Sequence, residues 1–181
     1  MKFSDLLKLD ASLSSHFRVA EKPGLLRSVA MVFAHSGDSW FWGVALIVLW
    51  FWGSDYWKSR AITLGISVAI TAVLVLVIKF TVKRKRPEGD WGGIYRSTDP
   101  HSFPSGHAAR SFMLAVVVIG LGPAWLGIIL AIWAPLVGAA RVAMGVHFIS
   151  DVLVGALLGI LMGCINLSLI PAGLALFSKL T

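Results

Sequence analysis

Histidine and aspartate stand at helical spacing in "HFISD", a polar cluster in an otherwise apolar stretch. His147 and Asp151 are four residues apart, so a helix places both on one face, with the carboxylate able to reach back to the imidazole. A carboxylate on one ring nitrogen fixes the tautomer and leaves the other nitrogen nucleophilic or basic. The same spacing also suits a structural pair, in which the two side chains only satisfy each other's hydrogen bonds where a membrane span begins.

A second cluster, "KFTVKRKRP" at residues 79–87, ends an apolar run. Lys79 and Arg86 are separated by about two helical turns, so they lie on nearly the same face, roughly 10 Å apart. Pro87 disfavours helix at the preceding residue and turns the chain out. Lys79 follows "VLVLVI", where an unpaired charge in a membrane is costly, and is a candidate functional residue. For residues 83–85 we expect a stop-transfer cluster whose side chains extend to the lipid headgroups.

A third cluster, "SFPSGHAAR" at residues 102–110, opens another apolar run. Ser102 or Ser105 can cap a helix that starts here, and Gly106 allows a ligand to approach the backbone closely. The free N–H groups of a helix start form an anion site, and His107 would face an anion bound there.

Arg141 lies near the end of a further apolar run, and its five donors suit bidentate contacts with phosphate. Together with the three clusters it brings cations, a helix start and two histidines to a lipid–water boundary. One histidine, backed by Asp151, can attack phosphorus, and the other can protonate the leaving oxygen. The residues therefore predict an active site for phosphoryl transfer.

The composition indicates a membrane protein whose spans position these clusters. Of 181 residues, 57% are hydrophobic and 14% charged, whereas soluble domains have about a quarter charged residues. A span needs roughly 20 mostly apolar residues. We expect an all-α, multi-pass bundle of about five spans, at residues 39–53, 60–82, 104–122, 124–144 and 147–170. The alternation of these spans places all three clusters on one membrane face.

The N-terminal region is predicted to lie in the membrane interface. Its apolar residues recur at helical spacing between polar ones, as in an amphipathic interfacial helix: Phe3, Leu6, Leu7, Leu13 and Phe17. A second short helix is expected at residues 24–34, before "HSGD" at 35–38 breaks the chain. The chain is thus read as one domain, 1–181, with interfacial helices in 1–36 and a transmembrane core in 39–170.

The net charge of +7 raises the question of a nucleic-acid partner. The basic residues gather at the edges of apolar runs with no interleaved base-stacking aromatics, which argues against nucleic acid and fits the phosphate of a lipid headgroup. Cys164 is the single cysteine, so no internal disulfide can form, and no Cys/His cluster has metal-ligand spacing.

The three clusters resemble the signature of the type 2 phosphatidic acid phosphatase superfamily of membrane lipid phosphatases, in the same order. The Lys-six residues-Arg-Pro element is "KFTVKRKRP", and the Pro-Ser-Gly-His element is residues 104–107. The Ser-Arg-five residues-His-three residues-Asp element is "ARVAMGVHFISD", in which Ala140 replaces the usual serine. That missing hydroxyl puts one contact of the phosphate site in question.

The resemblance implies a role for each residue and a reaction that needs no metal or other cofactor. His147 would form a phosphohistidine, oriented by Asp151, and His107 would be the general acid. The phosphate oxygens would be held by the remaining signature residues and a backbone N–H: Lys79, Arg86, Arg141, Ser105 and Gly106.

Three lipid substrates fit the resemblance: phosphatidic acid, phosphatidylglycerol phosphate and a polyprenyl diphosphate such as the undecaprenyl carrier. A phosphotransferase that passes the phosphate to another lipid would use the same residues. A small non-catalytic transporter or scaffold with a degenerate signature is the alternative from another class, but every charged and imidazole position of the signature is filled.

The membrane orientation is predicted differently by charge and by resemblance. All Lys and Arg residues except Lys58, Arg60 and Lys179 belong to the active face, which the positive-inside rule would place in the cytoplasm. The resemblance implies an outward-facing site in the cell membrane, and several of these cations serve phosphate. We therefore expect an extracytoplasmic active site.

Overall fold

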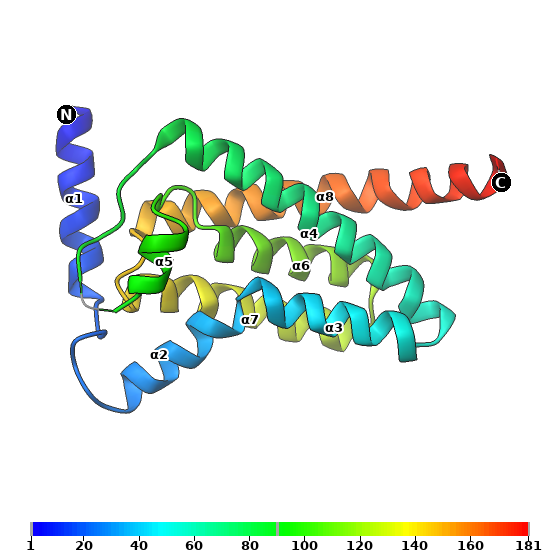
Figure 1. Cartoon of the computed structure of the whole chain (residues 1–181), viewed down its shortest axis with the longest axis horizontal. Helices are drawn as coiled ribbons and strands as arrows, with labels where there is room; N and C mark the ends of the chain where they lie inside the picture. Colours follow the sequence, from blue (N-terminus) through cyan, green and yellow to red (C-terminus); the bar gives the residue numbers. More distant parts are fainter. Residues whose placement is uncertain (1, 90, 181) are drawn as a thin grey trace.

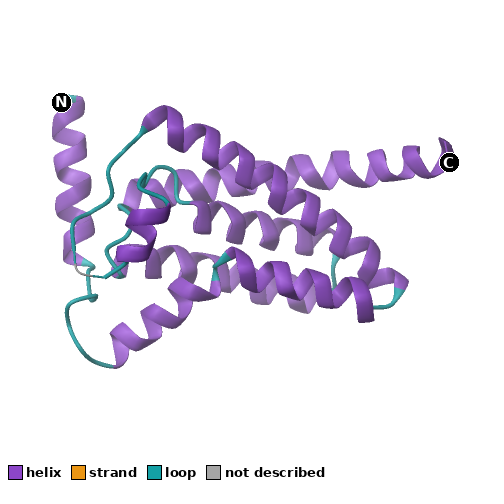
Figure 2. Cartoon of the chain, viewed as in Figure 1, coloured by secondary structure: helices purple, strands orange, loops and turns teal. Residues whose placement is uncertain are grey.

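The computed structural model describes residues 2–89 and 91–180, and these form a bundle of helices connected by loops (Figures 1 and 2). The helices in this part of the chain are α1 (Phe3–His16), α2 (Leu25–Ser36), α3 (Ser39–Trp52), α4 (Asp55–Val82), α5 (Gly93–Thr98), α6 (Gly106–Leu121), α7 (Ala124–Ala143) and α8 (Ile149–Leu180). The all-α prediction is confirmed, and each expected span corresponds to one of these helices.

Among the described residues, fewer helices than the five expected spans are long and apolar enough to cross a membrane. Helices α4 and α7 and the Ile149–Ile170 part of α8 are long and apolar enough to cross a membrane. Helices α2 and α3 pass the same test together, with a 54° bend between them, as a broken span or a re-entrant loop. Helix α6 has 16 residues, or about 24 Å of helix, against about 30 Å of hydrocarbon. Its N-terminal residues Gly106 and His107 line a cavity.

The outer faces of the long helices are suited to lipid. Large apolar side chains stand exposed along them, including Val73 (61%), Phe80 (60%), Ile132 (61%) and Leu157 (67%). Continuous apolar exposure of this kind marks a surface that contacts lipid or protein rather than water. With the apolar lengths of α4, α7 and α8, it identifies a membrane protein.

Helix α6 is the centre of the bundle and packs against α4, α7 and α8. Its Met113, Leu114 and Val117 are buried in a core that also contains Leu130 of α7 and Met162 of α8. Buried side chains thus surround α6 on several sides, which fixes the position of the site at its N-terminus.

Local sequence signals set the ends of the helices at the site. Helix α4 ends at Lys83, whose positive φ of 52° directs the chain away from the helix. Ser105 is the N-cap of α6, and its hydroxyl accepts a hydrogen bond from Ala108 N. Ser102 instead pairs with the chain after α4, since its N–H donates to Arg84 O at 2.8 Å. The loop before α6 is therefore tied to the end of α4.

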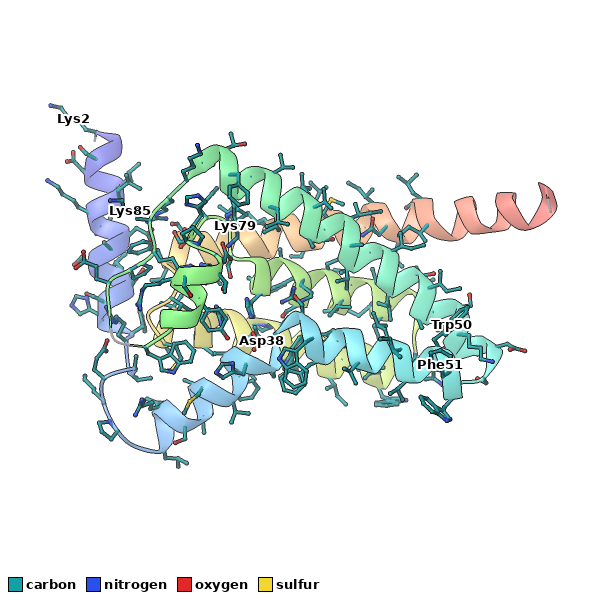
Figure 3. All side chains as sticks on the ribbon, in the orientation of Figure 1. Lys2, Asp38, Trp50, Phe51, Lys79 and Lys85 are labelled. Atoms are coloured by element: carbon teal, nitrogen blue, oxygen red, sulfur yellow. The ribbon has the colours of Figure 1, made fainter. Side chains whose placement is uncertain are left out.

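The polar clusters share one end of the bundle, as the alternation of spans predicted. Lys79 and Asp38 lie in the half nearer α1, while Trp50 and Phe51 lie toward the other end (Figure 3). Helix α1 runs across the polar end (Figure 1), and its Asp10 accepts hydrogen bonds from Ser150 at the start of α8. The outward orientation of this end stays a prediction.

Helices α6 and α8 approach closely along three glycines of α8. A Cβ on Gly159 would lie 2.2 Å from Ala109 O, and one on Gly155 would lie 2.5 Å from Ser105 O. At Gly163 a Cβ would instead meet the side chain of Val116, at 2.6 Å. Because backbone atoms of α6 occupy the space at Gly155 and Gly159, no side chain fits at these two positions without moving the helices apart.

We expect Gly159→Ala to lower the free energy of unfolding by about 1–3 kcal/mol through overpacking. Gly65→Ala is the matched control, since a Cβ on this glycine of α4 would meet nothing within 4 Å and alanine is the better helix former. Thermal unfolding of the purified proteins in detergent measures both. Equal stability of the two variants would contradict the close packing.

Candidate active site

Two cations of the site meet on one carboxylate. Asp99, just after α5, accepts hydrogen bonds through Oδ2 from Lys79 Nζ at 2.5 Å and Arg86 Nη2 at 2.8 Å. Lys79 and Arg86 are 3% and 8% exposed. Ion pairs of this kind offset the cost of burying charge. The prediction of a shared helix face is wrong, because α4 is Asp55–Val82 and Arg86 lies beyond it; the two cations meet through Asp99 instead.

Arg141, from the end of α7, is completely buried in the same region. Its guanidinium lies 4.2 Å from the centre of the Tyr95 ring, and its Nη1 donates to Ala34 O at 3.4 Å. Its Nε and Nη2 have no hydrogen-bond partner among the described residues. Unpaired buried donors are costly, and no described residue compensates these two nitrogens.

His147 stands directly beside these cations, between α7 and α8. Arg86 Nη1 lies 3.1 Å from His147 Nε2, which makes Nε2 the acceptor because a guanidinium only donates. Nδ1 lies 3.5 Å from Asp151 Oδ2, an electrostatic contact longer than an ordinary hydrogen bond. The carboxylate and imidazole predicted to face each other do so, and the nitrogen directed at the cations is Nε2.

Burial, together with the positive charges of Arg86, Arg141 and Lys79, holds the pKa of His147 well below its ordinary value. The imidazole is therefore neutral at neutral pH, and Nε2 has a lone pair, which here accepts the hydrogen bond from Arg86 Nη1. A protonated ring would have no lone pair to offer.

The start of α6 completes one wall of a cavity of about 230 Å³. Gly106 and His107 line it together with Lys79, Asp99 and His147. The cavity continues along α4 past Val75, Ala72 and Val68, which are apolar. It thus joins the cationic site to an apolar wall, as an amphiphilic ligand would require.

Ser105 takes a structural position in the site. Besides capping α6, it donates its own backbone N–H to Asp151 O at 2.9 Å, which ties the start of α6 to α8. Ala140, which stands in place of the usual serine, packs in an apolar cluster with Ala30, Ala34 and Met144. The methyl group is accommodated by alanines of α2.

The expectation for residues 83–85 is wrong for Arg84. Rather than extending to the headgroups, Arg84 is largely buried and donates to Asp151 Oδ1 at 2.8 Å and to Asp10 Oδ2 at 2.7 Å. Asp10 comes from α1, so the pair joins the N-terminal helix to the active site. The spacing of residues in the second cluster does not predict Asp10 as a partner, because Asp10 lies 74 residues away in the sequence.

Sequence reasoning also missed Asp38, which was read only as part of a chain break. Its carboxylate lies 2.6 Å from His107 Nε2 and 3.0 Å from His35 Nδ1. Tyr95 Oη donates to it at 3.1 Å. An aspartate before the first residue of a helix reads as a cap, and no other signal in the sequence points to His107.

Comparison with known proteins identifies the family of this chain. A family model described as the PAP2 superfamily matches residues 60–172. An undecaprenyl-diphosphatase from Sulfolobus acidocaldarius is 39% identical over 106 residues, which are 56% of this chain and 51% of that protein. The chain thus spans about half the length of this curated relative.

Two solved structures share the fold. LpxE from Aquifex aeolicus has a TM-score of 0.70 and 32% identity, covering 88% of this chain and 94% of that one. A transmembrane PAP2-type phosphatidylglycerolphosphate phosphatase from Bacillus subtilis has a TM-score of 0.74 and 24% identity, covering 90% of this chain and 84% of that one. The matched family region spans more than half of the chain and contains all three polar clusters, so the chain belongs to the PAP2 superfamily.

Proposed function

We propose that this protein removes phosphate from a membrane lipid phosphate or diphosphate through a phosphohistidine on His147. The observation that carries the proposal is the buried Arg141, with its unpaired Nε and Nη2, beside the neutral imidazole of His147 and the cations Lys79 and Arg86. A phosphate would satisfy the unpaired donors and bring phosphorus to Nε2.

The chemistry follows from these positions. When phosphate oxygens take over the hydrogen bond of Arg86 Nη1, the Nε2 lone pair of His147 attacks phosphorus while the bond from phosphorus to the leaving oxygen breaks, and His107 gives that oxygen a proton. Water then attacks phosphorus as the bond from phosphorus to Nε2 breaks, His107 takes a proton from the water, and phosphate leaves. Asp151 stabilises the positive charge that His147 acquires in the intermediate.

The substrate class is supported by the cavity and by the named relative. The apolar wall along α4 suits an acyl or prenyl chain that enters from the membrane. The Sulfolobus relative is named for undecaprenyl diphosphate. Polyprenyl diphosphates therefore stand beside phosphatidic acid and phosphatidylglycerol phosphate as proposed substrates.

Replacement of the nucleophile gives the most direct test. We expect His147→Ala to lower phosphate release from these lipids by on the order of 10³-fold or more, because no other group replaces an activated nucleophile. Quenching the unmodified enzyme and ³²P-labelled lipid with detergent at alkaline pH should trap a phosphoenzyme that acid then hydrolyses and that the variant lacks. His16→Ala, an exposed residue of α1, is the control. Residual activity above about a tenth of the original would refute the assignment.

The low pKa of His147 predicts the acid limb of the pH profile. Because the neutral ring is the nucleophile, kcat/KM should fall only well below pH 6.5, the ordinary pKa of histidine. Lys79→Met removes one of the charges that lower this pKa, so the limb should move to higher pH. Because both proteins are assayed with the same lipid, ionisation of the substrate affects both pH profiles equally and drops out of the comparison. A limb that stays in place would contradict the electrostatic origin of the shift.

The positive field of the site predicts metal-independent activity. Lys79, Arg86 and Arg141 supply the charge stabilisation that Mg²⁺ gives in other phosphoryl-transfer sites. We expect full activity in EDTA, no gain from added Mg²⁺, and inhibition by vanadate at lower concentrations than by phosphate, since vanadate adopts the geometry of the transition state. Activity that EDTA abolishes and Mg²⁺ restores, with no effect of vanadate, would exclude this mechanism.

A further inference from the structure

The break between α2 and α3 brings a carboxylate to the second histidine of the site. Asp38 lies in this break, where the two helices meet at 54°, and its Oδ1 is 2.6 Å from His107 Nε2. A carboxylate only accepts hydrogen bonds, so Nε2 carries the hydrogen. Burial raises the pKa of Asp38, but hydrogen bonds from His107 and His35 bring it below its ordinary value. Asp38 is therefore ionised at neutral pH.

The surroundings of His107 make this partner significant. Arg110 on the same helix and Arg141 from α7 both act on the ring with positive charge. Both charges oppose the protonated imidazole that a general acid must form. Asp38 contributes the opposing negative charge in direct contact with the ring.

The break itself is held in place by α6. Arg110, which is 8% exposed, donates through Nη2 to Gly37 O and through Nη1 to Ser39 Oγ at 2.6 Å. His107 and Arg110 are three residues apart on α6 and therefore share a face. One helix face thus binds the residue before Asp38, Asp38 itself and the residue after it.

We propose that Asp38 is a positioning residue for the reaction proposed above, holding Nε2–H of His107 so that Nδ1 transfers the proton to the leaving oxygen. The inference rests on the proposed function. When His107 is charged, both nitrogens carry hydrogen. Nδ1–H passes its proton to the oxygen whose bond to phosphorus breaks, while Nε2–H stays on Asp38 and the ring becomes neutral. The proton of the attacking water later returns to Nδ1.

The test compares two substrates that differ in their need for a proton. A long-chain alkyl phosphate has a poor leaving group, whereas p-nitrophenyl phosphate leaves readily without protonation. We expect Asp38→Asn to lower kcat on the alkyl phosphate by about 10²-fold, the low end of the range for general acid catalysis, and on the aryl phosphate by less than about 10-fold. The Ki of inorganic phosphate should change much less than kcat on the alkyl phosphate, because Asp38 acts on Arg141 only through its charge and has no hydrogen bond to the three cations.

Three further proteins make the result specific to proton transfer. In a His107→Gln background, Asp38→Asn should add little to the loss, since both act on the same proton. Asp38→Glu should restore part of the alkyl phosphate activity. Ser36→Ala is the matched control, because Ser36 lies at the same break and bonds Phe33 O and Trp133 Nε1 rather than His107. Ser36→Ala should leave the ratio of kcat on the alkyl phosphate to kcat on the aryl phosphate unchanged.

Equal losses on both substrates, or fully additive losses in the double variant, would overturn the positioning role and leave Asp38 as a structural residue. Thermal unfolding of each variant identifies any loss that comes from misfolding, in which case Asp38→Glu decides between the two roles. No turnover of either substrate by the unmodified protein would instead overturn the proposed function itself.

Discussion

Three buried cations, Lys79, Arg86 and Arg141, act on one small region at the polar end of the bundle. Each loses its hydration and repels the others, and such a cluster persists only where negative charge or lone pairs compensate it. Asp99 compensates two of them, and Arg141 keeps donors unpaired. Phosphate has the charge and the oxygens to satisfy all three at once. The need to hold this cluster together explains much of the structure around it.

The close contact between α6 and α8 supports the cluster of cations. Because the glycines of α8 admit the backbone of α6, the start of α6 reaches α8 directly, and Ser105 N donates to Asp151 O. Arg84 then links Asp151 to Asp10 of α1. A chain of contacts therefore runs from the core through the candidate active site to α1, so that the N-terminal helix is part of the site's support.

The two histidines have different environments, and this difference separates their proposed roles. His147 is nearly inaccessible, adjacent to three cations, and 3.5 Å from its carboxylate, which favours a neutral nucleophile. His107 also lies among cations, but it is 2.6 Å from the carboxylate of Asp38. This direct contact with a carboxylate is what distinguishes the proposed acid from the proposed nucleophile.

The sequence by itself determined the polar end, the three clusters and every helix of the described residues except α5 (Gly93–Thr98), because helical periodicity and apolar length are local properties. The fourth expected span, 124–144, differs from α7 (Ala124–Ala143) by one residue. Only the tertiary structure decided the partners of Asp38 and Arg84, which lie 69 and 74 residues away on other helices. Such pairs depend on how helices pack and on where a span breaks. The spacing of residues within one helix gives no information about helix packing or about the position of a break.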